Sequence, residues 1–366
     1  MILWVGILAA VLIATGLGMA YMTGAVGKYS FVIKLAGDSR LKKILIPLGL
    51  IILFIVLFSL IFSLVNSIII FLHMMLFFLL YGGIMKLVML ISGREFKIYW
   101  QGYLAPVTCF IYLAIGFYLC HHVWQVNYTL DSPKLSESVR IALFADSHMS
   151  TTFGGEGFAE HIETIKKQNP DIVLIPGDYV DDGSKKDDMI RACKALGSID
   201  CKYGVYYSVG NHDEGYYNNR EFSFDELVNE LKKNGVHVLE DEKESVGELL
   251  IVGRKDTQVK ERLKMDELLK DADEDKYIIV LDHEPNDYDA QAKSKADLVV
   301  SGHTHGGQLF PLAYVGVWLG ANDKSYGHEK RNNTDFIVTS GISCWEILFK
   351  TGTKSEYVII DVNPDK

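Results

Sequence analysis

Cysteine is scarce in this sequence, and its arrangement gives no support to a disulfide framework. The 366 residues include five cysteines, and no two of them form a Cys-x-x-Cys pair. Three lie in the polar part of the chain, at Cys193, Cys201 and Cys344. An odd number of this kind is not typical of a disulfide-stapled domain. A bridge between Cys193 and Cys201 stays open, and cysteine usage alone does not settle the compartment.

Charge is almost absent from three stretches in the first third of the chain. Residues 2–22 and 103–120 are each close to the ~20 residues that one helical membrane crossing requires. Residues 44–89 are apolar almost throughout, and this length fits two crossings joined by a tight hairpin near residues 65–67. We therefore expect residues 1–122 to form an all-α region with four transmembrane helices.

Basic residues in this third predict its orientation. Residues 1–124 hold eight Lys or Arg and two Asp or Glu, and all eight basic residues lie between the first two spans or around the connection of the last two. Short cytoplasmic loops are enriched in Lys and Arg. We therefore expect a multi-pass protein of the cell membrane. Its N-terminus, its hairpin and everything after Cys120 should lie outside the cytoplasm.

The remainder of the chain is acidic and has no basic stripe. It holds 28 basic and 44 acidic residues, which argues against nucleic acid as a partner. From Arg140 onward, short β-rich runs alternate with stretches of helical period. This alternation predicts a layered α/β domain over residues 139–366, preceded by a linker over residues 123–138.

Two histidines framed by glycines follow the apolar residues 298–300. His303 and His305 are two residues apart, so a strand that ends there directs both side chains the same way. Four other predicted strands also end in residues that commonly bind metals. These are Asp146 and His148, Asp178, Asn211, and His283. Open α/β sheets place their sites at the carboxyl edge of the strands, so these side chains should converge.

The donor set predicts two metal ions. Two carboxylates, four imidazoles and one amide are too many for one four-coordinate zinc, and they suit a pair of ions bridged by Asp178. Nitrogen and oxygen donors without thiolate favour Mn, Fe or Zn over calcium. Two cations ~3.5–4 Å apart can share a hydroxide that attacks a phosphoester in line. His212, oriented by the neighbouring carboxylate of Asp213, is suited to proton transfer to the leaving group.

Taken together, these motifs resemble those of a known enzyme family. The set D-x-H, G-D, G-N-H-D, H-x-P and G-H-x-H-G-G, within residues 139–362, resembles the calcineurin-like metallophosphoesterase superfamily, in its membrane-anchored bacterial branch. The resemblance implies a four-layer αββα sandwich with a dinuclear metal centre and His212 as the catalytic histidine. It assigns Asp146, His148, Asp178 and His305 to one ion, and Asp178, Asn211, His283 and His303 to the other.

The expected function is that of a membrane-anchored, metal-dependent phosphoric ester hydrolase. Placement outside the cytoplasm favours a lipid-linked or envelope phosphoester over cytoplasmic nucleotides as its substrate. The alternative is a membrane receptor or transport component whose domain binds metal or a phosphorylated ligand without turnover. A substituted ligand or a missing His212 would favour this alternative, and the sequence has neither.

Overall fold

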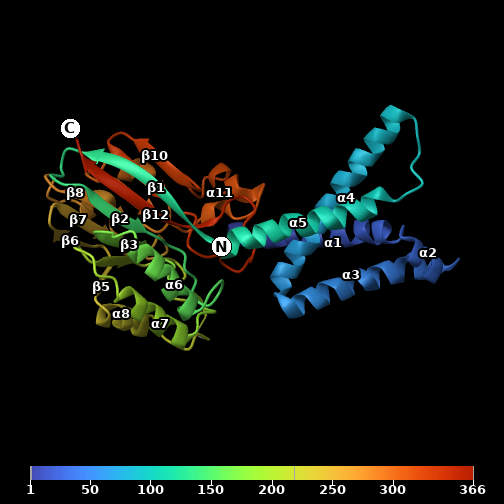
Figure 1. Ribbon diagram of the computed structural model, residues 1–366, viewed down its shortest axis with the longest axis horizontal. Coiled ribbons are helices and arrows are strands. Elements are labelled where there is room, and N and C mark those ends of the chain that lie inside the picture. The colour runs from blue at the N-terminus through green and yellow to red at the C-terminus, as the bar shows by residue number, and fades with distance from the viewer. Residues whose placement is uncertain (1, 218, 366) are drawn as a thin grey trace. The chain divides into compact units, whose positions relative to one another are not determined.

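The computed structural model describes residues 2–217 and 219–365 (Figure 1). It consists of two compact units that divide between Gly116 and Phe117. The first unit is entirely helical. Its helices are α1 (Ile2–Val26), α2 (Ser30–Ala36), α3 (Lys42–Ile61), α4 (Leu64–Ser92) and α5 (Trp100–His121), the last of which ends in the second unit.

Four of these helices, α1, α3, α4 and α5, are long and apolar enough to cross a membrane. Many of their large apolar side chains point outward, as at Leu17, Leu60 and Phe110. Such exposure would be costly in water, and it is the arrangement that lipid favours. The prediction of four apolar N-terminal helices is therefore confirmed.

The break between α3 and α4 lies a few residues before the predicted hairpin. The two helices are separated by Phe62 and Ser63. The Ser63 hydroxyl accepts a hydrogen bond from the Asn66 amide at 3.1 Å and so caps α4. Asn66 and Ser67, predicted to form the turn, instead lie in the first turn of the helix. The prediction of the hairpin position was wrong because polar residues near a helix start can act as caps as well as turns.

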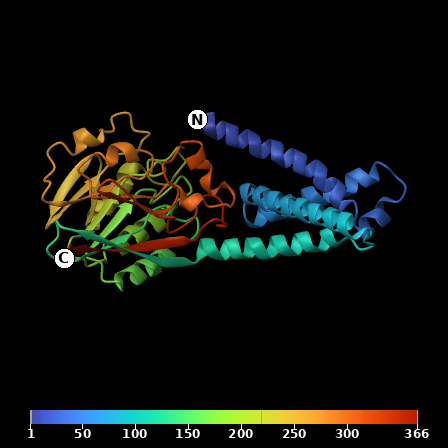
Figure 2. The ribbon, with the colours of Figure 1, turned by 90° about the horizontal axis from the view of Figure 1, so that it is seen from above.

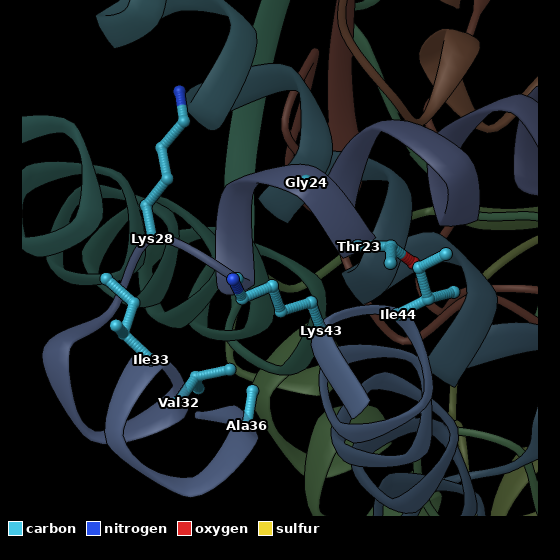
Figure 3. Close-up of a pocket in the computed structure, with 9 residues that line it drawn as sticks. Thr23, Gly24, Lys28, Val32, Ile33, Ala36, Lys43 and Ile44 are labelled. Atoms are coloured by element: carbon cyan, nitrogen blue, oxygen red, sulfur yellow. The ribbon is translucent and has the colours of Figure 1, made fainter. Parts of the chain in front are cut away.

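The connection between α1 and α3 surrounds a hollow of about 420 Å³ (Figure 3). Its walls come from the end of α1, from α2, which the sequence did not predict, and from the start of α3. The lining residues are Thr23, Gly24, Gly27, Lys28, Val32, Ile33, Ala36, Lys43 and Ile44. The hollow is thus formed by the same basic connection that predicts the orientation of the chain.

The second unit contains two six-stranded sheets. The first has the order β1-β12-β2-β3-β4-β5, and the second has the order β10-β11-β9-β8-β7-β6. The strands of the first sheet are β1 (Val123–Ser132), β2 (Val139–Leu143), β3 (Ile172–Pro176), β4 (Val205–Ser208), β5 (Val236–Leu239) and β12 (Ser355–Pro364). Those of the second are β6 (Glu242–Val246), β7 (Leu249–Gly253), β8 (Tyr277–Leu281), β9 (Leu298–Ser301), β10 (Gly327–Arg331) and β11 (Thr334–Val338).

Helices cover the outer face of each sheet. Three amphipathic helices pack on the first sheet, and two short ones pack on the second. They are α6 (Gly155–Lys166), α7 (Lys186–Leu196) and α8 (Phe224–Lys233), and then α9 (Met265–Leu268) and α10 (Tyr288–Gln291). The remaining short elements are η1 (His305–Gly307), η2 (Leu312–Tyr314) and α11 (Val315–Trp318).

The hydrophobic core is built by side chains that point alternately to the two faces of each buried strand. In β3, Val173 and Ile175 face the helices, whereas Ile172 and Leu174 face the opposite sheet. The inter-sheet layer is completed from the other side by residues such as Ile279 of β8. Four layers in the order αββα result, which confirms the predicted fold class.

The segment 123–138 is not a linker, in contrast to the prediction. Its first ten residues form β1, which pairs in parallel with β12 from Val123 opposite Ser355 to Ser132 opposite Pro364. Edge strands keep one face in solvent, and their polar side chains make them look like connecting segments in a sequence. The charged edge strands β6 and β10 escaped prediction for the same reason.

A disulfide joins Cys120, in the last turn of α5, to Cys344, in the loop that follows β11. Cys109, Cys193 and Cys201 are unpaired. The bridge between Cys193 and Cys201 that the sequence left open is therefore not formed. The disulfide adds a covalent connection between the end of the fourth apolar helix and the α/β domain.

This pairing can be tested by counting thiols. Full-length protein purified without reductant and alkylated under denaturing conditions should gain three labels, and it should gain five after reduction. Peptide mass spectrometry should find Cys120 linked to Cys344, and Cys344→Ser should leave Cys120 open to alkylation. Five labels without reduction would contradict the assignment.

Candidate metal centre

The predicted site residues lie where strands of both sheets end. In the first sheet, β2, β3 and β4 are parallel neighbours, and in the second sheet β8 and β9 are parallel neighbours. Their carboxyl ends therefore meet at one edge of the sandwich. The strand-end segments bring Asp146 and His148, Asp178, Asn211 to Asp213, His283, and His303 and His305 to that edge.

Glycines allow these segments to approach one another closely. A Cβ atom at Gly177 would lie 2.6 Å from His283 Nδ1, and a Cβ at Gly210 would lie 2.3 Å from Asp178 Oδ1. Both distances are shorter than any non-bonded carbon contact allows. Gly177 also has a φ of +83°, which glycine adopts without strain. Gly177 thus leaves room for His283 of the second sheet, and Gly210 leaves room for the carboxylate of Asp178.

The side chains form two groups of three potential ligands, and in each group the donor atoms lie within 4.8 Å of one another. The first group is Asp146, His148 and His305. Within it, His148 Nε2 lies 3.2 Å from His305 Nε2. The second group is Asp178, His283 and His303. Within it, His283 Nε2 lies 3.1 Å from Asp178 Oδ2.

Asp178 also reaches the first group. Its Oδ2 atom lies 3.6 Å from His148 Nε2, so the same carboxylate oxygen faces a histidine of each group. Asn211 joins the second group, because its Oδ1 atom lies 2.9 Å from His303 Nδ1. The structure therefore brings all seven predicted ligands into one cluster, with the Asp178 carboxylate facing both groups.

The buried atoms of this cluster fit metal ions. Asp146 Oδ2 and His305 Nδ1 are buried and make no hydrogen bond to the residues that the structure describes. A buried polar atom without a partner is costly, and a cation would supply one. Carboxylate, imidazole and amide donors together suit divalent transition metals. The residues present are therefore suited to hold such ions.

The electrostatics of the cluster are dominated by the pair of Asp178 and His283. Burial by itself raises the pKa of Asp178, but His283 and the other nearby histidines outweigh it and hold this pKa well below its usual range. Burial likewise lowers the pKa of His283, and the carboxylate of Asp178 outweighs it and raises this pKa well above its usual range. Positive charge is thus strongly favoured beside Asp178.

The backbone is strained where the ligands are presented. Five of the seven have a positive φ, which is uncommon for residues other than glycine. They are Asp146 (56°), His148 (37°), Asp178 (53°), His303 (69°) and His305 (48°). Such conformations cost about 1–3 kcal/mol each and persist where the surrounding structure enforces them, often at functional sites.

His212 lies beside the cluster with aromatic neighbours on two sides. Its ring centroid is 4.8 Å from that of Trp345 and 5.2 Å from that of Tyr216. Its backbone N–H donates to Asp178 Oδ1 at 2.9 Å. Burial lowers the pKa of His212 to about 4, so its imidazole is neutral at neutral pH.

Asp213 contacts the backbone of the neighbouring segments. Its carboxylate accepts hydrogen bonds from the amides of Asp178 (2.8 Å), Val180 (3.0 Å) and Gly210 (2.7 Å). Among the residues that the structure describes, this carboxylate makes no hydrogen bond to the His212 ring. The structure therefore places Asp213 where it holds two strand-end segments together.

Asp181 is a site residue that the sequence analysis missed. Its Oδ2 atom lies 3.4 Å from His148 Nδ1, on the side of the ring away from His305. A carboxylate behind a metal-binding histidine fixes the tautomer and orientation of its ring. The available signal was the carboxylate pair Asp181 and Asp182, which follows Asp178 by three residues.

The loop after β11 forms another wall that the sequence did not reveal. Gly341 packs against Asp146, because a Cβ at this glycine would lie 2.7 Å from Asp146 Cβ. The buried Lys350 ammonium donates to the carbonyl of Ser340 at 2.6 Å, and burial lowers its pKa to about 7. This contact holds the loop that carries Trp345 toward His212.

Comparison with known proteins finds relatives for the part of the chain that carries the clustered ligands. The family model described as calcineurin-like phosphoesterase matches residues 139–307. An uncharacterized metallophosphoesterase of Aquifex aeolicus is 31% identical over 197 residues, which cover 52% of this chain and 72% of that protein. The residues matched by the family model include all seven clustered side chains.

Longer relatives match over more of the chain. An uncharacterized metallophosphoesterase of Campylobacter jejuni is 28% identical over 65% of this chain and 62% of its own length. A protein of Danio rerio described as a transmembrane protein with metallophosphoesterase domain is 27% identical over 63% of this chain and 55% of its own length. The matches thus span less than two thirds of these two relatives.

Metal content should separate the roles of Asp178 and Asp181. Asp178→Asn should lower the content of both ions, because one carboxylate faces both groups. Asp181→Asn should lower the affinity for one ion by about 10–100-fold, which is typical for the loss of a group that orients a ligand. Elemental analysis and competition titration of the purified full-length protein measure both effects.

Asp187→Asn is the matched control, because Asp187 is an exposed carboxylate on α7. It should leave metal content unchanged. Full occupancy of both ions in Asp178→Asn would contradict the bridging position.

Proposed function

The chain belongs to the calcineurin-like phosphoesterase family, and from this premise we propose that it is a membrane-anchored, dinuclear metal-dependent phosphoesterase. Its substrate is a phosphoester, and its catalytic domain lies outside the cytoplasm. The observation that carries the proposal is the position of Asp178, whose carboxylate faces a histidine of each ligand group. Two groups of three ligands, with one carboxylate that faces both, are suited to bind two metal ions.

The residues divide between the two ions as their contacts suggest. Asp146, His148 and His305 with Asp178 would hold one ion, and Asp178, Asn211, His283 and His303 would hold the other. When bound, a pair of divalent transition metals, Mn, Fe or Zn, supplies Lewis acidity toward phosphoryl oxygens and makes water more acidic. The protein contributes the fixed, buried ligands and the groups around the substrate.

His212 acts on the leaving group. Its imidazole is neutral in the free site because burial lowers its pKa to about 4. An anionic phosphoester beside it favours the protonated ring, since an opposite charge nearby stabilises the charged form. His212 can then donate a proton to the departing oxygen. Trp345 and Tyr216 restrict the ring on two sides and so fix its direction.

Asp213 acts through the backbone. Its carboxylate accepts hydrogen bonds from the backbone amides of Asp178 and Gly210. These bonds fix the position of Asp178 and of the turn that carries His212. We therefore assign Asp213 as a positioning residue for both. This differs from the role expected from the sequence, in which Asp213 orients the imidazole of His212.

Two observations support the placement of the domain outside the cytoplasm. Seven of the eight basic residues of the first unit lie between α1 and the first turn of α3 or between α4 and α5, and Lys86 lies in the last two turns of α4. An even number of spans returns the chain to the side of its N-terminus. The disulfide between Cys120 and Cys344 is of a kind that persists in oxidising compartments. This location favours lipid-linked or envelope phosphoesters over cytoplasmic nucleotides.

Hydrolysis by the purified protein tests the activity. Full-length protein in detergent should hydrolyse at least one of a panel of phosphomonoesters, phosphodiesters and pyrophosphate-linked lipids when supplied with Mn, Fe or Zn. Chelation should abolish the activity, and metal should restore it. His212→Ala should keep both ions while turnover falls ~10²–10⁴-fold, as for other lost acid–base groups. Metal binding without hydrolysis of any panel member would favour a non-catalytic receptor.

The side of the membrane is tested on intact cells. Protease added to spheroplasts should degrade residues 123–366, and a reporter fused after Lys366 that is active only outside the cytoplasm should give signal. A reporter that is active only in the cytoplasm should stay silent. Protection of the domain until the membrane is permeabilised would overturn the orientation and the substrate preference drawn from it.

A further inference from the structure

An uncharged, apolar segment directly follows the metal-binding histidines. Residues 309–322 contain no Asp, Glu, Lys or Arg, and they include η2 and α11. Large apolar side chains along this segment are exposed to solvent. They are Phe310 (62%), Leu312 (58%), Tyr314 (56%), Trp318 (74%) and Leu319 (60%). We call residues 309–320 the apolar loop.

This exposure is concentrated in one place. Among the described residues after His122, nine large hydrophobic side chains are exposed, and five of them belong to the apolar loop. The other four are Ile190, Tyr216, Tyr217 and Leu263. Isolated exposed apolar residues are normal, whereas a contiguous patch marks an interaction surface.

The loop is firmly attached, so its apolar side chains are held outward by the fold. Leu309 and Ala313 are buried, and Ala313 packs so closely that a Cβ at Gly307 would lie 2.2 Å from its Cα. The Phe310 amide donates to Thr351 Oγ1 at 3.0 Å. The inward residues therefore anchor the loop, while the outward ones remain without a covering layer in the described part of the chain.

The loop lies beside the end of the fourth apolar helix. A Cβ at Gly352 would lie 3.4 Å from Ala313 Cβ and 3.4 Å from the Phe310 backbone nitrogen, so Gly352 lies next to the loop. Gly352 also lines a hollow of about 350 Å³ together with Leu119 of α5. The last turn of α5 belongs to the same compact unit as the loop. Figures 1 and 2 both show α11 at the end of the domain where β1 begins, directly after α5.

Aromatic and basic side chains gather at that end. The rings of Tyr118 and His122 pack edge-on against Trp124, with centroids 5.5 Å and 4.3 Å away. The ammonium of Lys354 lies 5.4 Å from the centroid of the Trp124 ring. Tryptophan, tyrosine and lysine at the end of an apolar helix are typical of the membrane–water interface. Residues suited to lipid headgroups therefore surround the end of α5, in the same compact unit as the apolar loop.

We propose that the apolar loop inserts into the interfacial region of the bilayer that the chain's own helices cross. The partner is lipid: the surface is uncharged, carries Phe, Leu, Tyr and Trp, and lies beside the point where α5 ends. Its length is that of an interfacial segment and is too short to span a bilayer. A protein partner or a second copy of the chain would have to cover a surface next to a membrane span.

Insertion would place the metal centre at the membrane surface. His305 is separated from the loop only by Gly306, Gly307 and Gln308, and the Gln308 amide donates to the Ile347 carbonyl in the loop that carries Trp345. Substrates with the phosphoester at headgroup level would then be reached directly. This consequence, unlike the insertion itself, rests on the proposed function.

Spin-label accessibility tests the insertion without any need for activity. Full-length protein with Cys109, Cys193 and Cys201 replaced by alanine is labelled at Trp318→Cys and reconstituted in phospholipid nanodiscs. The label should be accessible to oxygen, which concentrates in lipid, and protected from a water-soluble nickel complex. Tyr217→Cys is the matched control, because Tyr217 is also aromatic and 72% exposed. Its label should show the opposite preference.

A label at position 318 that is as open to nickel as the label at position 217 would overturn the proposal. Protection from both reagents would also overturn it, because this outcome indicates a protein covering. The double variant Leu312→Glu, Trp318→Glu should lose hydrolysis of phosphoester lipids in bilayers and keep that of water-soluble phosphoesters. If no phosphoester is hydrolysed by the unaltered protein, the proposed function fails while the accessibility result still decides insertion.

Discussion

The buried carboxylate of Asp178 is the constraint on which the rest of the site depends. It lies between histidines from both sheets, at 3.1 Å from His283 and 3.6 Å from His148. A charge removed from water requires partners, and here those partners come from strands of different sheets. The sandwich therefore has to bring two carboxyl edges together, and Gly177 and Gly210 remove the side chains that would prevent it.

The surroundings of the site serve to hold this arrangement. Asp213 binds the amide of Asp178, and Asp181 lies behind His148. Positive φ angles at five of the clustered residues show that the local backbone is not in its lowest-energy conformation. The strain is maintained by cores on both sides of each sheet, where close packing resists the small shifts that would relax the turns.

The connection to the membrane is part of the α/β domain. The chain passes from α5 directly into β1, which pairs with β12 along ten residues, and the disulfide fixes Cys344 to the same helix end. The loop that carries Trp345 begins next to that cysteine, so one wall of the site is attached to the end of the fourth span. Membrane anchoring and the shape of the site are thus structurally linked.

The sequence by itself determined the four apolar helices, a layered α/β domain and the identity of the seven clustered side chains. Each follows from local pattern: charge-free length, strand and helix period, and polar residues at the ends of apolar runs. The αββα order of the layers was implied only by the resemblance of the motifs to a known family. Only the tertiary structure decided that residues 123–132 are an edge strand, that Cys120 pairs with Cys344, and that Asp181, Trp345 and Lys350 belong to the site. The Trp345 loop and the disulfide depend on contacts between residues up to 224 positions apart. Asp181 reaches His148 only because neighbouring strands align their ends, and no local pattern encodes such alignment.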